Sequence, residues 1–122
     1  MTKILIVDDD EETATMLRIL LASAGYETTS EIESSRVMQA ANSTNPDLFI
    51  LDLMMPEPDG FQLCRMLRAD PTFEHTPILI VTALDDRDSQ AVAYGAGAND
   101  YITKPYRIEE LTKRVKVLLG EN

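Results

Sequence analysis

Short apolar runs recur along the chain, and each of them ends in polar residues or in a turn. The runs and the residues that follow them are 4–7 with Asp8, Asp9 and Asp10, 48–51 with Asp52, 78–81 with Thr82, and 101–103 with Lys104. An apolar run of this length, bounded by turn signals, fits a strand that is buried on both faces of a parallel sheet. Between the runs, apolar residues return every three or four positions, which indicates helices with one buried face.

These patterns predict strands and helices that alternate along the whole chain. The expected strands are 3–7, 27–31, 47–52, 77–82 and 99–103, and the expected helices are 11–24, 34–43, 60–68, 86–95 and 107–119. Alternation at such short intervals means a parallel sheet with right-handed crossovers and with helices on both faces. The sequence therefore predicts an α/β fold.

Three of the expected helices carry apolar stripes that we expect to face the sheet. The stripes are Met16, Leu17, Leu20, Leu21 and Ala24 in helix 11–24, Phe61, Cys64 and Leu67 in helix 60–68, and Ile108, Leu111, Val115 and Leu118 in helix 107–119. The outer face of the last helix carries two pairs of opposite charge, each worth a few tenths of a kcal/mol. These pairs are Glu109 with Lys113 and Glu110 with Arg114.

Length, composition and charge limit the class of protein. A chain of 122 residues with 44% hydrophobic residues has the size of one globular domain, and we expect one domain over residues 1–122. The formal net charge of −10 repels phosphate backbones, so we expect no direct binding of nucleic acid. The chain has no apolar run of about 18 residues and no basic, apolar leader, so we expect a cytoplasmic protein without a membrane anchor. The lone Cys64 excludes an internal disulfide and a Cys-based zinc site.

Polar side chains at four expected strand ends form the candidate site. Parallel strands bring their carboxyl ends to one edge of the sheet, where open α/β sheets bind their ligands, so Asp8, Asp9, Asp52, Thr82 and Lys104 should meet there. Two carboxylates about 4 Å apart repel each other by about 4 kcal/mol at an effective dielectric constant near 20. Three converging carboxylates therefore need a cation or raised pKa values. Oxygen ligands without His or Cys nearby favour Mg²⁺, or Mn²⁺, as that cation.

This set of residues suits phosphoryl transfer. Asp52 is the candidate nucleophile, the metal and Lys104 neutralise charge on the transferring group, and Thr82 donates a hydrogen bond to one of its oxygens. Taken singly, each residue also has an ordinary structural explanation, such as a helix cap for Thr82 or a surface position for Lys104. Their joint occurrence at successive strand ends favours the functional interpretation.

Four stretches of the sequence together resemble one known family. They are Ile-Leu-Ile-Val-Asp8-Asp9, then Leu-Asp52-Leu-Met-Met-Pro56 with Asp59-Gly60, then Val-Thr82-Ala83, and finally Gly95-Ala-Gly97-Ala-Asn-Asp-Tyr101 leading to Lys104-Pro105. The chain resembles the receiver domain of two-component response regulators, and the resemblance covers essentially all 122 residues. It implies a flavodoxin-like fold with a five-stranded parallel sheet of order 2-1-3-4-5.

The resemblance also implies a role for each site residue. Asp52 would accept a phosphoryl group from a phosphohistidine on a histidine kinase or a histidine phosphotransfer protein, in a Mg²⁺-dependent reaction. Asp9 would be the main acidic metal ligand, Asp8 would act partly through water, and the backbone carbonyl of Met54 would complete the protein ligands. Lys104 would pair with the phosphoryl group. Such a domain catalyses only its own phosphorylation and dephosphorylation, so it is not a metabolic enzyme.

A conformational switch is implied as well. In the family, phosphorylation draws the hydroxyl of the residue at Thr82 inward, and the aromatic residue at Tyr101 follows. The change repacks the face made by helix 86–95, strand 99–103 and helix 107–119, through which such domains meet each other as homodimers or meet their targets. Without the resemblance, Tyr101 would be read as a half-exposed aromatic residue of a strand.

Two other classes of protein compete with this interpretation. An aspartyl-nucleophile phosphatase of the haloacid-dehalogenase type carries a second Asp two residues after the nucleophile, and that position is Met54 here. A degenerate receiver that only binds partners would have lost part of its acceptor site. The set Asp8, Asp9, Asp52, Thr82 and Lys104 is intact, which argues against a degenerate receiver.

Overall fold

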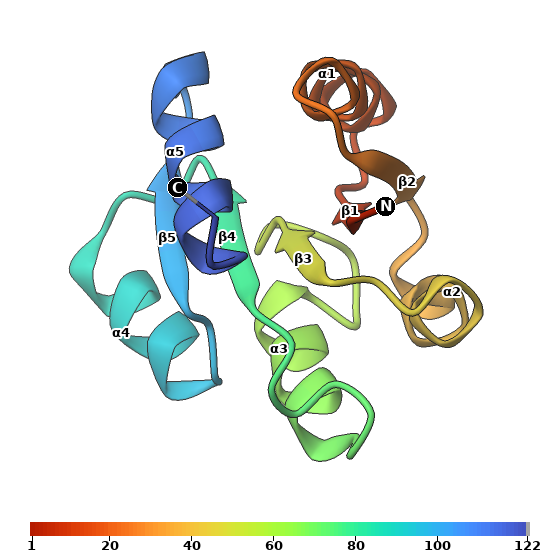
Figure 1. Cartoon of the computed structure of the whole chain (residues 1–122). Helices are drawn as coiled ribbons and strands as arrows, with labels where there is room; N and C mark the ends of the chain where they lie inside the picture. The colour runs from red at the N-terminus through yellow and green to blue at the C-terminus, as the bar shows by residue number, and fades with distance from the viewer. Residues whose placement is uncertain (122) are drawn as a thin grey trace.

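A computed structural model describes residues 1–121 as a five-stranded parallel sheet in the order β2-β1-β3-β4-β5, with the strands and helices alternating along the chain (Figure 1). The strands are β1 Lys3–Val7, β2 Glu27–Glu31, β3 Leu48–Leu51, β4 Ile78–Thr82 and β5 Asp100–Thr103. The α-helices are α1 Glu11–Ser23, α2 Val37–Thr44, α3 Gly60–Ala69, α4 Arg87–Gly95 and α5 Ile108–Leu118. None of these helices is long and apolar enough to cross a membrane.

The order of the strands and their parallel pairing confirm the predicted flavodoxin-like architecture. Every predicted bound lies within one residue of the observed one, except the start of the expected helix 34–43, which was wrong. It begins with a separate 3₁₀ turn, η1 Ser34–Arg36, before α2 starts at Val37. Strand β3 ends at Leu51, so Asp52 is the first residue beyond the strand.

The helices cover the two faces of the sheet as separate layers. Helices α1 and α5 lie on one face, and α2, α3 and α4 lie on the other (Figure 1). Alternate residues of strand β3 point to opposite faces of the sheet. Phe49 and Leu51 pack in the core under α2, α3 and α4. Leu48 and Ile50 pack in the core under α1 and α5. All four residues are at most 1% exposed, as expected for a central strand buried on both sides.

Several predicted core positions were wrong. Met16 is 62% exposed and Ile108 is 52% exposed, because the buried stripe of α1 runs through Ala14, Leu17 and Leu21 and that of α5 through Leu111 and Val115. Helix α3 buries Cys64 and Leu67 as predicted and also Leu63, whereas Phe61 is only partly buried. The apolar pattern therefore overestimates the buried stripes of α1 and α5, whereas in α3 the buried position is Leu63 rather than Phe61.

Candidate functional site

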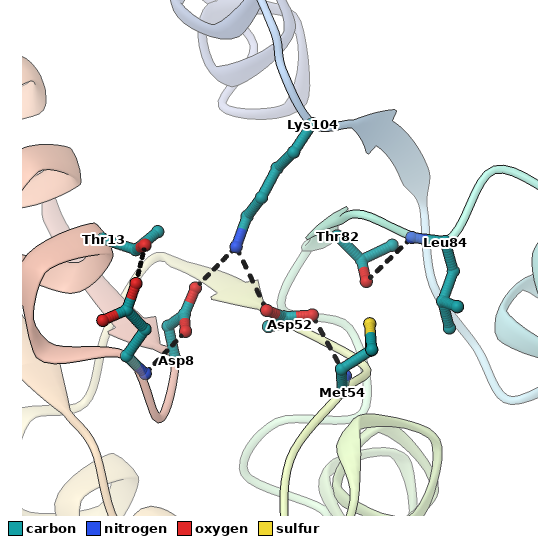
Figure 2. A network of polar contacts seen from close by, with 8 residues as sticks. Asp8, Thr13, Asp52, Met54, Thr82, Leu84 and Lys104 are labelled. Carbon is teal, nitrogen blue, oxygen red and sulfur yellow. Dashed lines mark hydrogen bonds and ion pairs between the residues drawn. The ribbon is translucent and has the colours of Figure 1, made fainter.

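The carboxylates of Asp8 and Asp52 lie on either side of the ammonium group of Lys104 (Figure 2). The Nζ atom of Lys104 is 2.9 Å from Oδ2 of Asp8 and 3.1 Å from Oδ2 of Asp52. The three side chains directly follow the ends of β1, β3 and β5, and Asp8 and Lys104 are 96 positions apart in the sequence. The structure thus brings together three residues that the sequence analysis placed at one edge of the sheet.

Backbone hydrogen bonds hold these side chains in place. The N–H of Asp10 donates to Oδ1 of Asp8 at 2.9 Å, and the N–H of Met54 donates to Oδ1 of Asp52 at 3.0 Å. Each carboxylate therefore uses one oxygen to accept from the backbone of the next loop and the other to accept from Lys104. Lys104 is itself positioned by β4, because its N–H donates to the carbonyl of Thr82 at 2.7 Å.

Burial shifts the pKa values of the charged side chains in this group. Asp8 is 2% exposed and Asp52 is 7% exposed. Burial raises the pKa of the Asp8 carboxyl above its ordinary value of 3.8, although the hydrogen bond from Lys104 opposes the shift. For Lys104, burial works to lower the pKa, but the hydrogen bond to Asp8 and the charge of Asp52 outweigh it and raise the pKa. The ammonium group therefore stays charged while two buried carboxylates share it.

Gly60 lets helix α3 begin directly against the loop that follows Asp52. A Cβ atom at Gly60 would collide with the backbone carbonyl oxygen of Asp52 and with Cα of Leu53. The N–H of Gly60 donates to the carbonyl of Leu53 at 3.2 Å, and Asp59 caps the helix by accepting from the N–H of Gln62 at 2.9 Å. Asp59 and Gly60 entered the predicted site only through the resemblance, and this positioning role was not predicted. The signal was the Asp-Gly pair at a helix start after a proline-rich loop.

Thr82 and Tyr101 meet at the backbone of Leu84. The N–H of Leu84 points to Oγ1 of Thr82 at 3.5 Å, and the hydroxyl of Tyr101 donates to the carbonyl of Leu84 at 2.7 Å. Thr82 is fully buried and Tyr101 is 8% exposed, with its ring centroid 6.4 Å from that of Tyr94. Tyr101 is therefore an inward-facing residue in this structure, and its reading as a half-exposed aromatic residue was wrong.

The two remaining predicted ligands are Asp9 and Met54. Asp9 is exposed, and Met54 is 54% exposed with its side chain beside the carboxylate of Asp52 (Figure 2). Within residues 1–121, no group of three His, Cys, Asp or Glu side chains could hold a metal ion. The donors at this edge of the sheet are carboxylate and carbonyl oxygens with more acidic than basic charge, which is the donor chemistry that Mg²⁺ prefers.

The face formed by α4, β5 and α5 carries both apolar and paired charged residues. Val92 and Tyr94 of α4 are 48% and 46% exposed. Arg114 of α5 pairs with Asp100 at 2.5 Å and, more loosely, with Glu110 at 3.9 Å, which confirms the predicted contact between Glu110 and Arg114. Arg114 thus ties the start of β5 to the middle of α5 on this face.

A flavodoxin-like sheet with buried aspartates and a lysine at its carboxyl edge defines a class of signalling domains, and comparison with known proteins agrees with it. The family model of the response regulator receiver domain matches residues 4–116. The chain is 39% identical, over 98% of its length and 49% of the relative, to the DNA-binding dual master transcriptional regulator RpaA of Synechocystis sp.. The chain spans about half the length of the curated relatives it matches.

Solved structures of response regulators and of receiver domains also match the chain closely. A crystal structure of a protein assigned as a response regulator, from Chloroflexus aurantiacus, is 38% identical with a TM-score of 0.93, and the match covers 98% of both chains. The receiver domain of the sensor histidine kinase PA1611 from Pseudomonas aeruginosa is 28% identical with a TM-score of 0.89 over 98% of both chains, and it has a magnesium ion coordinated in its active-site cleft.

The chain belongs to the receiver-domain family of two-component response regulators. Acceptance of a phosphoryl group is general to this family, and receiver domains generally bind Mg²⁺ in their active sites. The family is one of signalling domains rather than metabolic enzymes.

Proposed function

We propose that this chain is a phosphorylation switch in which Asp52 accepts a phosphoryl group from a phosphohistidine on a histidine kinase or a histidine phosphotransfer protein. The observation that carries the proposal is the ammonium group of Lys104, which lies within 3.1 Å of both Asp8 and Asp52. This contact holds a positive charge beside Asp52, where it can stabilise the negative charge of an arriving phosphoryl group.

The transfer step forms one bond and breaks another. A carboxylate oxygen of Asp52 attacks the phosphorus atom of the phosphohistidine, the new O–P bond forms, and the N–P bond breaks with its electron pair left on the imidazole nitrogen. Lys104, already in contact with the attacking carboxylate, stabilises the negative charge of the phosphoryl oxygens, and the hydroxyl of Thr82 donates to one of them. Dephosphorylation is attack by water on the same phosphorus atom, which releases inorganic phosphate and restores the Asp52 carboxylate.

Asp8, Asp9, Asp52 and the backbone carbonyl of Met54 are the residues that would hold Mg²⁺, or Mn²⁺. The two carboxylates of Asp8 and Asp52 against the single ammonium group of Lys104 leave an excess of negative charge at this edge, which fits a divalent cation. When bound, the ion neutralises charge on the transferring phosphoryl group. The chain's own contribution is to hold Asp8 and Asp52 in fixed orientations through the N–H groups of Asp10 and Met54.

The response to phosphorylation would pass through Leu84. Because the backbone of this residue contacts both Thr82 and Tyr101, a shift of the Thr82 hydroxyl towards the phosphoryl group would alter the start of the loop that leads into α4. We propose that the face formed by α4, β5 and α5 changes as a result, and that partners or a second copy of the chain bind there. Exposed Val92 and Tyr94 give this face the apolar surface that such contacts need.

We propose that residues 1–122 work as a single receiver domain that does not contact nucleic acid itself and does not enter a membrane. The net charge of −10 supports the first part, because such a chain is repelled by phosphate backbones. RpaA is a DNA-binding protein by name, but the match covers only 49% of it. The cytoplasm, where phosphorylated kinase domains are available, is the proposed location.

The function is tested by measuring the intact mass after incubation with a small acyl-phosphate donor, with and without Mg²⁺. The expected result is a Mg²⁺-dependent gain of one phosphoryl group. No gain, under conditions that label another receiver domain, would contradict the proposal and favour a domain that only binds partners. Extensive hydrolysis of the donor without a trapped adduct would instead point to a phosphatase, against which the apolar Met54 now argues.

The phosphorylated form should decay slowly, because Met54 and Leu84 beside the site are both apolar. Neither side chain can hold a water molecule in position to attack the acyl phosphate. Replacing either residue by Asn or Glu should therefore accelerate dephosphorylation several-fold, and phosphate release measured over time would show it. Unchanged or slower decay in the variants of both positions would refute this explanation.

A further inference from the structure

One buried polar residue stands apart from the site described above. Among residues 1–121, four polar or charged residues are buried, and three of them are Asp8, Asp52 and Thr82. The fourth is Ser34, which is 8% exposed. Its hydroxyl donates to the backbone carbonyl of Pro56 at 2.9 Å, across 22 positions of sequence. A serine at the start of a helical turn commonly caps its own backbone, but here it bonds the loop that follows the phospho-acceptor.

The loop 53–57 has two anchors, and Met54 lies between them. At its start, the N–H groups of Met55 and Gly60 both donate to the carbonyl of Leu53, at 3.1 and 3.2 Å. At its other end, Pro56 has no N–H to donate, and neither has Pro58, so the backbone here has few hydrogen bonds of its own to make. The hydroxyl of Ser34 supplies an anchor from a different element of the fold.

We propose that Ser34 is a positioning residue for Mg²⁺ binding, because its bond to Pro56 fixes the backbone of Met54. This inference rests on the proposed function, in which the carbonyl of Met54 is a metal ligand. The N–H of Met54 donates to Oδ1 of Asp52 without any contribution from Ser34, so we expect the loss of the Ser34 anchor to disturb the carbonyl of Met54 rather than the position of Asp52. Groups that orient metal ligands from behind typically change metal affinity by about 10- to 100-fold when they are removed.

The test is a titration of the unphosphorylated protein with MgCl₂, followed by the amide chemical shifts of residues near the site. We expect Ser34→Ala to bind Mg²⁺ about tenfold more weakly than wild type, since it loses the anchor. Ser35→Ala is the matched control, because Ser35 is the exposed neighbour, and it should stay within twofold of wild type. Equal affinities of Ser34→Ala and Ser35→Ala would overturn the proposal.

A second pair of variants separates the hydroxyl from packing. Ser34→Thr and Ser34→Val have nearly the same shape and differ in the hydroxyl, so the comparison holds even if Ser34→Ala fails to fold. Ser34→Thr should bind Mg²⁺ clearly more tightly than Ser34→Val, and equal affinities would overturn the role of the hydroxyl.

The rate of phosphorylation provides a readout that a purely structural role would not produce. At saturating Mg²⁺, Ser34→Ala should reach the wild-type rate of phosphorylation by an acyl-phosphate donor, because only the metal affinity has changed. A low rate that persists at saturation would overturn the inference. If the wild-type chain shows no Mg²⁺-dependent shifts, the proposed metal site itself is refuted, which is distinct from a failure confined to Ser34.

Discussion

Replacing Asp52 by Ala should abolish the gain of phosphoryl mass, in the presence or absence of Mg²⁺. The variant lacks the buried carboxylate that follows β3 and contacts Lys104, so no nucleophile remains at the position where the phosphoryl group would arrive. Intact mass after incubation with an acyl-phosphate donor measures the result. Glu57→Gln is the control, since it removes an exposed acid of the same loop and should label like wild type.

Labelling of Asp52→Ala at the wild-type level would contradict the proposal and place the acceptor elsewhere.

The free energy of unfolding gives an independent check on the same residue. The charge of Asp52 is one cause of the raised pKa of Asp8, so the isosteric Asp52→Asn should relieve repulsion between two buried carboxylates. We expect the free energy of unfolding of Asp52→Asn at pH 7, measured in urea, to equal or exceed that of wild type. Residues selected for function commonly lower stability in this way.

The sheet could be predicted from sequence because its three central strands are almost purely apolar. In β1, β3 and β4, no polar residue interrupts the buried runs, so the pattern specified both their position and their burial on two faces. Helix bounds were predictable to about one residue, since Gly25 and the capping residue Asp59 mark where α1 stops and α3 starts. Which face of a helix is buried was less certain, as exposed Met16 and Ile108 show.

The central residues of the site could be predicted because each of them directly follows an apolar strand. Asp8, Asp52 and Lys104 each directly follow a strand of one parallel sheet, so topology alone brings them together. The supporting contacts could not be foreseen in this way. Ser34 bonds the backbone of Pro56, 22 positions away, and the direction of a loop carbonyl depends on packing that no local pattern encodes.

Replacing Lys104 by Met should slow phosphorylation of Asp52 about 10²- to 10³-fold, the loss typical when one charged group that stabilises a transition state is removed. The rate of mass gain at saturating Mg²⁺ measures this effect. Met has a similar length and keeps the apolar contacts of the stem, so the comparison isolates the ammonium group. A rate within threefold of wild type would show that Lys104 is structural only.

The same substitution should lower stability in a pH-dependent way. Without Lys104, Asp8 loses the hydrogen bond and the charge that oppose its raised pKa, so its pKa in the folded state rises further above the ordinary value of 3.8. A carboxyl with a raised folded pKa contributes full stability below its unfolded pKa, and this contribution is lost as the pH rises through the folded pKa. The difference in unfolding free energy between wild type and Lys104→Met should therefore be small near pH 4 and grow towards pH 7.

At pH 7 we expect this difference to reach about 2–3 kcal/mol. Breaking a fully buried ion pair costs roughly 3–5 kcal/mol, and the side chain of Lys104 keeps 24% of its surface exposed, which reduces the effect. Urea unfolding at several pH values gives the curve, and the double variant Asp8→Asn with Lys104→Met is the control. Because Asn carries no charge, the double variant should recover part of the stability at pH 7 and lose much of the pH dependence. An equally steep dependence in the double variant would show that Asp8 is not the group that Lys104 neutralises.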